Sequence, residues 1–274
     1  MKSLAGMRKS PPSVRRGRAQ FSEPRAAVEV VHGLRAGLAV FARRRDQIVR
    51  VAHTRAVQRD LAEVTRWAVA HDVPCLEMSE RELDRFTEST QNEGLCVVTR
   101  PRRWLTTSEL ADALAGAGLA VALDRVRNPY NVGAVMRTAA FFGLDAALLG
   151  APAPHPGLAP TAVRVAEGGV EHLKLARTTD LAATLARLRA GGVHAIGSDS
   201  GAPARPVGFT FARPAVLVVG NEREGLDRRV RAECDALVAI PGSGAIESLN
   251  VAVAAAILLS EMVRSQKSPG AGHR

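Results

Sequence analysis

Short apolar runs alternate with amphipathic runs along most of this chain, and that alternation limits its fold more than any other feature. In the second half, strands are predicted at 119–123, 146–149, 173–176, 193–197, 215–219 and 236–240, and helices at 132–142, 160–167, 181–190, 227–233 and 249–264. Strands that are joined through helices are typical of a mainly parallel sheet covered on both faces. The sequence therefore predicts an α/β fold.

A smaller α/β unit is predicted before it, at residues 28–100. Its expected strands are 28–31, 48–51, 74–77 and 95–99, and its expected helices are 33–41, 55–71 and 80–87. Ser79 and Glu82 have the spacing of a capping box at the start of the last helix. Roughly 70 residues are enough for a compact domain.

The remaining boundaries follow from composition. A polar, basic stretch opens a predicted linker at 101–117, in which Ser108 is expected to cap a helix over 109–115. The larger unit then spans 118–265. A disordered basic arm is predicted at 1–27 and a disordered tail at 266–274.

The charge balance favours a polyanionic partner, because 37 Lys and Arg against 27 Asp and Glu give a net charge of +10. The N-terminal arm is rich in arginine and lysine and suits contact with RNA phosphates, although a tail without a role or a transit peptide has a similar composition. Three widely spaced cysteines fit a reducing cytoplasm, and no metal-binding spacing is apparent. No apolar run approaches the roughly 20 residues that a membrane span needs.

Three loops after predicted strands combine glycine with compact polar side chains. In the first, Asn128-Pro129 is a turn signal, and Asn131 is expected at a helix N-cap. Gly133 permits close approach, and Arg137 follows Asn131 by six residues, so both side chains are expected to reach toward one end of the helix. A helix N-terminus with an arginine is suited to phosphate, while the alternative is a capped turn with a surface arginine.

In the second loop an apolar strand ends at Gly220-Asn221-Glu222, followed by Gly225. Gly220 lets the backbone approach a ligand, and Glu222 could orient a polar group. Glycines after strands are common, so this loop is only moderately specific by itself.

The third loop runs from Ile240-Pro241 through two glycines to Ser248, Leu249 and Asn250, which open the last helix. Ser248 and Asn250 are either caps of that helix or parts of a ligand site. Glu247 stands where a dinucleotide fingerprint would have its third glycine, which argues against a nicotinamide site.

Together, these three segments resemble the SpoU–TrmH family of RNA ribose 2′-O-methyltransferases, within the SPOUT class. The shared frames are N-x-G-x-x-x-R at 131–137, G-N-E-x-x-G at 220–225, and I-P followed by S-L-N at 240–250. Residues 163–173 also look like the family's middle segment. Residues 28–100 resemble the family's substrate-binding domain through His32, Gly33 and residues 91–94.

This resemblance implies a C-terminal SPOUT-type parallel sheet with a deep trefoil knot, a smaller N-terminal α/β domain, and a homodimer. It also implies that S-adenosyl-L-methionine is the cofactor. The residues implied to bind it are Gly220, Asn221, Ile240, Pro241 and Leu249, and those implied to be catalytic are Asn131, Arg137, Glu222, Ser248 and Asn250.

The resemblance makes Arg137 the group that activates the 2′-hydroxyl. An arginine pKa of about 12.5–13.8 leaves almost no neutral base, so we favour a role in binding phosphate and stabilising the forming alkoxide. Ribosomal RNA is the favoured substrate because the smaller domain suits structured RNA. Transfer RNA, methylation of a base, and a non-catalytic RNA-binding role remain alternatives.

Overall fold

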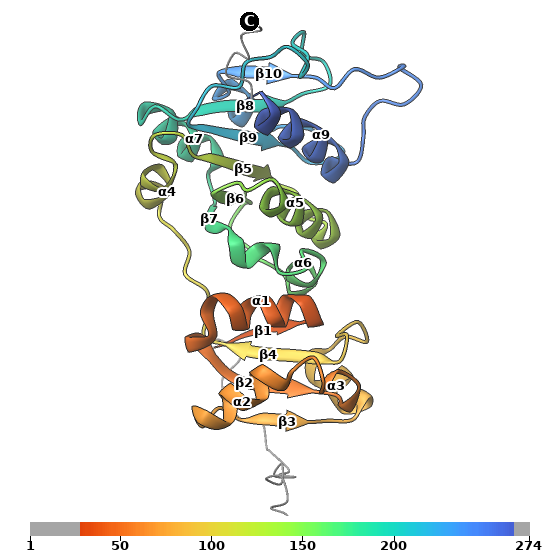
Figure 1. Cartoon of the computed structure of the whole chain (residues 1–274). Coiled ribbons are helices and arrows are strands. Elements are labelled where there is room, and N and C mark those ends of the chain that lie inside the picture. Colours follow the sequence, from red (N-terminus) through yellow and green to blue (C-terminus); the bar gives the residue numbers. More distant parts are fainter. Residues whose placement is uncertain (1–27, 266–274) are drawn as a thin grey trace, which may run out of the picture.

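The computed structural model describes residues 28–265, which form two sheet-containing units stacked end to end (Figure 1). The predictions for the arm at 1–27 and the tail at 266–274 lie outside these residues. Within the described part, no helix is long and apolar enough to cross a membrane.

The smaller unit contains a four-stranded sheet in the order β1 (Glu29–His32), β4 (Leu95–Thr99), β2 (Ile48–His53), β3 (Cys75–Glu77). Strand β4 runs antiparallel to both of its neighbours, and β2 and β3 are parallel. Its α-helices are α1 (Leu34–Arg44), α2 (Ala62–Ala70) and α3 (Glu80–Thr87). Ser79 and Glu82 form the predicted capping box of α3.

The helix predicted at 55–71 is wrong in its first half. A 3₁₀ turn, η3 (Arg55–Val57), comes first, and α2 begins only at Ala62. Leu61 is fully buried and has non-helical backbone angles, φ −100° and ψ 12°. Val57 and Leu61 pack in the core of the smaller unit, and this packing has overridden their helical spacing. A second 3₁₀ turn, η2 (Arg45–Gln47), links α1 to β2.

The larger unit contains a six-stranded sheet in the order β10 (Ala236–Val238), β8 (His194–Ser198), β9 (Ala215–Val219), β5 (Leu119–Asp124), β6 (Ala146–Gly150), β7 (Lys174–Thr178). Every pair of neighbouring strands is parallel. The sequence prediction of a parallel sheet is confirmed.

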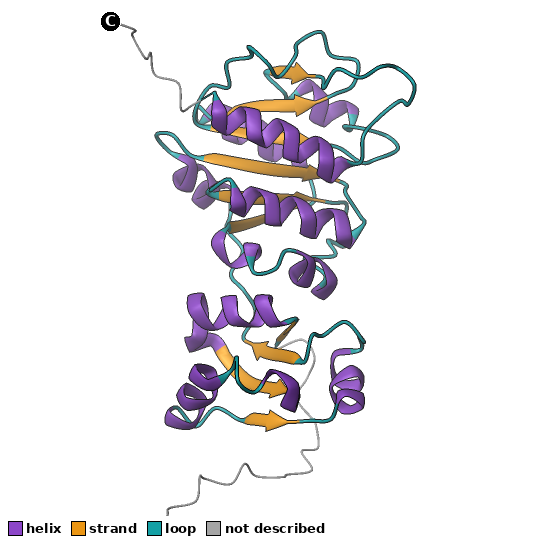
Figure 2. Cartoon of the chain, turned by 45° about the vertical axis from the view of Figure 1, so that its right-hand side comes forward, coloured by secondary structure: helices purple, strands orange, loops and turns teal. Residues whose placement is uncertain are grey.

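Helices cover both faces of this sheet (Figure 2). Along β5, Leu119, Val121 and Leu123 join the core beneath α5 (Pro129–Phe141) and α9 (Val251–Arg264). Ala120 and Ala122 point the other way, toward α4 (Thr107–Leu114), α7 (Leu181–Ala190) and α8 (Arg228–Ala232). Burial on both faces explains why the strands have continuous apolar runs instead of apolar–polar alternation.

The segment 101–117, predicted as a linker, contributes to the larger core. Its helix α4 begins after Thr106, which forms a capping box with Glu109, so the expected cap at Ser108 is wrong by two positions. Leu110 and Leu114 of α4 are buried against the six-stranded sheet. The Leu105 amide donates to the Leu175 carbonyl at 2.8 Å.

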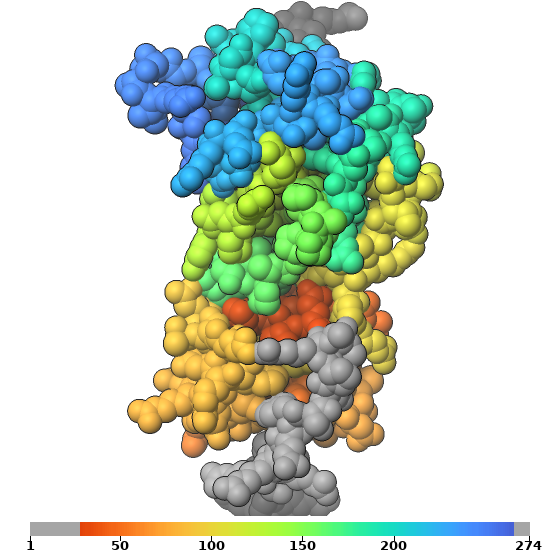
Figure 3. Space-filling view, turned by 180° about the vertical axis from the view of Figure 1, so that it is seen from behind, coloured from red at the N-terminus to blue at the C-terminus, as the bar shows by residue number. Residues whose placement is uncertain are grey.

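The two units meet where α1 packs against α6 (Pro160–Val165) and the 3₁₀ helix η4 (Gly169–His172). In the space-filling view, the red residues of the smaller unit lie directly against the green surface of the larger one (Figure 3). Val163 of α6 is buried in the core of the smaller unit, so the contact includes shared apolar packing.

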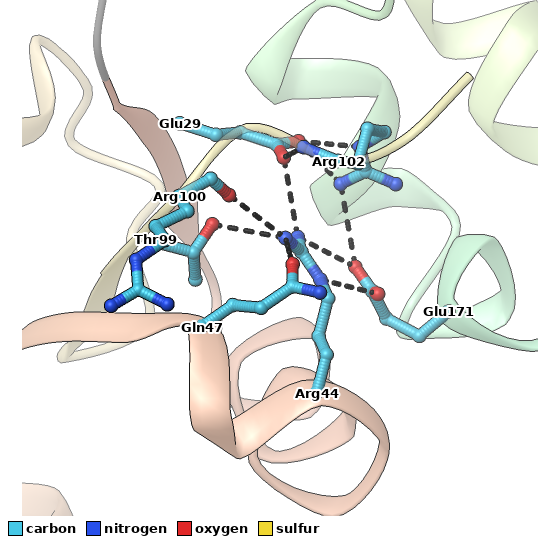
Figure 4. Close-up of polar contacts among 7 residues, drawn as sticks. All are labelled: Glu29, Arg44, Gln47, Thr99, Arg100, Arg102 and Glu171. Atoms are coloured by element: carbon cyan, nitrogen blue, oxygen red, sulfur yellow. Dashed lines mark hydrogen bonds and ion pairs between the residues drawn. The ribbon is translucent and has the colours of Figure 1, made fainter.

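Four charged side chains form a buried cluster at this contact, which we call the interdomain lock (Figure 4). Arg44 pairs with Glu171 at 2.8 Å and with Glu29 at 3.2 Å, and Arg102 pairs with the same two carboxylates. These side chains are between 5% and 19% exposed. Two cations and two anions balance, which offsets the cost of removing the charges from water.

Replacing Glu171 with alanine is expected to destabilise the protein by about 3–5 kcal/mol, because it leaves two buried arginines with a single carboxylate. Calorimetry should show a lower melting temperature and a split into two transitions, one for each unit. Glu233→Ala is the control, because its pair with Arg189 is more exposed. Equal stability of the two variants would show that the lock does not hold the units together.

Candidate active site

The loops that follow β5 and β9 meet at the same edge of the larger sheet. These strands are neighbours, and Leu123 pairs with Val219 near their carboxyl ends. The chain then enters α5 on one face of the sheet and α8 on the other. A crevice at such a point is the usual ligand site of an open α/β sheet.

The start of α5 corrects one prediction. Asn128, not Asn131, is the N-cap, and its side-chain oxygen accepts a hydrogen bond from the Tyr130 amide at 2.9 Å. Pro129 fixes this start, because its φ suits the first helical position and it has no amide hydrogen to satisfy. Asn131 therefore lies within the first turn, and its side chain is available for other contacts.

Asn131 is the centre of a polar chain that joins three distant segments. Its Nδ2 donates to Glu222 Oε1 in the loop after β9. Its Oδ1 accepts from Nδ2 of Asn250 at 3.1 Å. Asn250 also caps α9, since its Oδ1 accepts from the Ala252 amide at 2.9 Å. Both sequence interpretations of Asn250, cap and site residue, are thus compatible.

The loop after β9 is shaped by Gly220 and Asn221. A Cβ on Gly220 would lie 2.3 Å from the Gly225 carbonyl carbon, so only glycine fits without moving the backbone. Asn221 pairs with Gly225 through both backbone groups, and its Nδ2 donates to the Arg125 carbonyl at 3.1 Å. The side chain of Asn221 and both of its backbone groups are therefore committed to the loop.

Two residues of this site, Asp124 and Arg125, were missed by sequence reasoning. Asp124 is buried at the end of β5 and accepts a hydrogen bond from the Asp227 amide at 2.6 Å. Partial burial alone would lower the pKa of Arg125, but its contacts with Asp124 and Glu224 raise it, so the side chain stays charged. An aspartate that directly follows an apolar strand was the available signal.

The third loop is open to solvent. Pro241, Ser248 and Leu249 are exposed, and Leu249 has 41% of its surface accessible. Ile240, in contrast, is partly buried against the main core. Within residues 28–265, no hydrogen bond joins Ser248 to the Asn131–Glu222–Asn250 chain.

Arg137 lies further along α5 and forms an ion pair with Glu167 at 2.9 Å. Its side chain is 54% exposed. Among the described residues, no hydrogen bond connects it to Asn131, although the two were expected to reach the same end of the helix. The structure therefore links three of the five predicted catalytic residues directly.

The SpoU rRNA methylase family matches residues 118–260, more than half of the chain. This chain belongs to the SpoU rRNA methylase family. The match covers β5 to α9 and includes all ten predicted site residues. The resemblance inferred from the three loop motifs is confirmed.

Relatives with names and known structures extend the comparison. A 23S rRNA (guanosine-2′-O-)-methyltransferase RlmB of Nitrosomonas europaea is 36% identical over 208 residues, covering 75% of this chain and 78% of that protein. An uncharacterized tRNA/rRNA methyltransferase of Mycobacterium avium is 34% identical over 216 residues, or 78% of this chain and 69% of the relative. The crystal structure of an AdoMet-bound rRNA methyltransferase from Sinorhizobium meliloti aligns with TM-score 0.73 and 26% identity, covering 89% of each chain.

Replacing Gly220 with alanine should lower the free energy of unfolding of this SpoU-family chain by about 1–3 kcal/mol, because the new Cβ overlaps the Gly225 backbone. Chemical denaturation measures the change. Gly201→Ala is the matched control, since its Cβ would make ordinary contact at 3.4 Å. If both variants unfold like the parent, the loop is not as tightly closed as described.

Proposed function

We propose that this protein transfers the methyl group of S-adenosyl-L-methionine to a ribose 2′-hydroxyl of ribosomal RNA. The observation that carries the proposal is the polar chain Glu222–Asn131–Asn250, because it joins the three family motifs at the carboxyl ends of the strands, where a ligand crevice is expected in such a sheet. Family membership and the named relatives support the reaction, the cofactor and the RNA class. A guanosine of 23S-type RNA is the target that RlmB's name suggests.

The three motif loops have features that a nucleoside cofactor needs. Gly220 allows the tight turn of the loop after β9, and the Asn221 carbonyl keeps a second lone pair beyond its bond to the Gly225 amide. Ile240 is partly buried and Leu249 is exposed, so both can offer apolar surface from the third loop, which also contains Pro241. We propose that these five residues hold S-adenosyl-L-methionine, mainly through backbone contacts.

When bound, the cofactor supplies a methyl group on a positively charged sulfur. Asn131, Glu222, Ser248 and Asn250 would orient the target ribose, and orientation can lower a barrier by up to about 7–11 kcal/mol. Glu222 keeps a carboxylate oxygen beyond its bond to Asn131, which can accept a hydroxyl hydrogen. Arg137 would bind a neighbouring phosphate and stabilise negative charge on the reacting oxygen.

We also propose that the protein is a homodimer that uses the outer face of α5 and α9. These helices pack against each other, yet their outer face and the adjoining loop retain exposed apolar side chains, namely Tyr130, Phe141, Ile246, Leu249, Val253 and Ile257. Exposed apolar side chains gathered on two packed helices favour an interaction site. The surface lies beside Asn131 and Asn250, so a partner would border the crevice.

The family's deep trefoil knot is part of this proposal. After the edge strand β10, the chain returns to the middle of the sheet, where α9 packs against β9 and α5. Such a return brings residues 240–250 past the loops after β5 and β9, which is where a knot would be threaded. The smaller unit would act as the RNA-binding domain, and an rRNA substrate would place the enzyme in the cytoplasm.

Methyl transfer is tested with purified protein, tritiated cofactor and rRNA from cells that lack this gene. We expect label in ribosomal RNA, at a nucleotide whose 3′ linkage resists alkali because its 2′-oxygen is methylated. Asn131→Ala should lower the turnover by about 100-fold, since orientation of the ribose is lost. Label in a base, in transfer RNA alone, or in no RNA would contradict the proposal.

The dimer is tested with Val253→Glu, which places a charge on the exposed face of α9. We expect light scattering after gel filtration to show a monomer, whereas the parent protein shows twice the chain mass. Val69→Glu is the control, because Val69 is exposed on α2, far from this face. A Val253→Glu variant that keeps the parent's mass would exclude this interface.

A further inference from the structure

The contact between the two units has a second charged cluster, which differs from the interdomain lock. Glu167 accepts Arg137 at 2.9 Å through one carboxylate oxygen and Arg35 at 2.8 Å through the other. Arg35 belongs to α1 of the smaller unit, and Arg137 belongs to α5 of the larger one. One carboxylate thus holds the guanidinium groups of two units close together.

The two clusters differ in charge and exposure. The lock has equal numbers of cations and anions and is largely buried. The Arg35–Glu167–Arg137 cluster has one surplus positive charge, and its arginine side chains are 72% and 54% exposed. An arginine that shares one carboxylate keeps further N–H donors for another acceptor. This end of the contact therefore presents unused donors and positive charge to solvent.

The backbone beneath the cluster is held in a costly conformation. Glu167 has φ +46°, in the left-handed region, which costs a non-glycine residue about 1–2 kcal/mol. At the adjacent Gly168, a Cβ would lie 2.6 Å from Cβ of Ala39 on α1. At Gly169, a Cβ would lie 3.1 Å from Cα of Arg137. The segment 167–169 is therefore packed tightly between α1 and α5. Glu167 occupies a position where glycine would be less strained.

We propose that Arg35 and Arg137, held together by Glu167, form one binding site for a backbone phosphate of the substrate RNA. This inference rests on the proposed function and adds Arg35 to it. Arginine forks match the geometry of phosphate oxygens, and one phosphate would offset the surplus charge of the cluster. Because the lock fixes α1 relative to the larger unit, RNA bound by the smaller unit would enter the crevice with this phosphate in a set position.

Arg35 and Glu167 are partners in one ion pair, yet their replacement should have opposite effects on RNA binding. Arg35→Met removes phosphate donors and should weaken binding by about three- to tenfold at moderate salt. Glu167→Gln removes the competing negative charge and should tighten binding. A purely structural ion pair would give effects of the same sign, or none.

The measurement is filter binding of a labelled 23S rRNA transcript between 50 and 300 mM KCl, roughly the range over which phosphate contacts weaken most visibly. Because Arg137 remains at the same phosphate, Arg35→Met should reduce the steepness of the salt dependence by less than the roughly 0.7–0.9 that one phosphate contributes. The double variant Arg35→Met/Arg137→Met should lose no more than about 0.7–0.9, because both arginines bind the same phosphate.

Arg43→Met is the matched control. Arg43 lies on the same helix and pairs with Nδ1 of His172 at 2.8 Å across the same contact, but it does not touch Glu167. Its affinity should stay within about twofold of the parent's. Equal losses for Arg35→Met and Arg43→Met, a loss of steepness in the double variant well above that of one phosphate, or weaker binding by Glu167→Gln would each overturn the phosphate site.

Methylation of the same transcript by the parent protein separates this inference from the proposed function. If the parent methylates the RNA but Arg35→Met binds it with unchanged affinity and salt dependence, the phosphate site alone is wrong. If the parent neither binds nor methylates ribosomal RNA, both the proposed function and the phosphate site fail.

Discussion

The parallel pairing of β5 with β9 is the constraint on which the rest of the larger unit depends. These strands are separated by almost a hundred residues, yet their register aligns Leu123 with Val219 at the edge where both strands end. Without that pairing, the segments that carry Asn131 and Glu222 would not lie side by side. Leu119, Val121 and Leu123 face one core and the smaller Ala120 and Ala122 face the other, which fixes the register, because a one-residue slip would exchange the large and small side chains between the two faces.

Charge organises the contact between the two units. At one end, the lock buries balanced charges and holds α1 against η4. At the other, Glu167 leaves two arginines exposed with a surplus positive charge. Burial decides which role each set of charges has, since a buried cluster must be neutral whereas an exposed one can attract a polyanion. A rigid contact with a cationic edge suits a protein that must present a defined RNA segment to a crevice.

Much of the fold could be predicted from the sequence, because apolar periodicity is a local signal. Apolar periodicity predicted the parallel sheet and the strands β4 and β9, and the spacing of Ser79 and Glu82 predicted the capping box of α3. Errors arose where two similar residues competed for one role. Asn128 and Asn131 are both good caps, and Pro129 decided between them. Thr106 and Ser108 are likewise both good caps. Thr106 is the cap because the carboxylate of Glu109, three residues later, accepts a hydrogen bond from its amide.

The sequence predicted which residues belong to the candidate site better than it predicted how they are arranged. The three motifs named Asn131, Glu222 and Asn250, but only the fold shows that they are joined by hydrogen bonds. The role of Glu167 was beyond the sequence for the same reason. Its contacts with Arg35 and Arg137 depend on how α1 and α5 pack around Gly168 and Gly169, which no local pattern encodes.

The central claim is that the loops after β9 and before α9 together hold the cofactor. Hydrogen–deuterium exchange with and without saturating S-adenosyl-L-methionine tests it most directly. We expect slower exchange at residues 220–226 and 240–250, which come from separate parts of the chain, and unchanged exchange in β1 to β4. Protection confined to one of the two loops, or spread over the smaller unit instead, would contradict a shared pocket at this edge of the sheet.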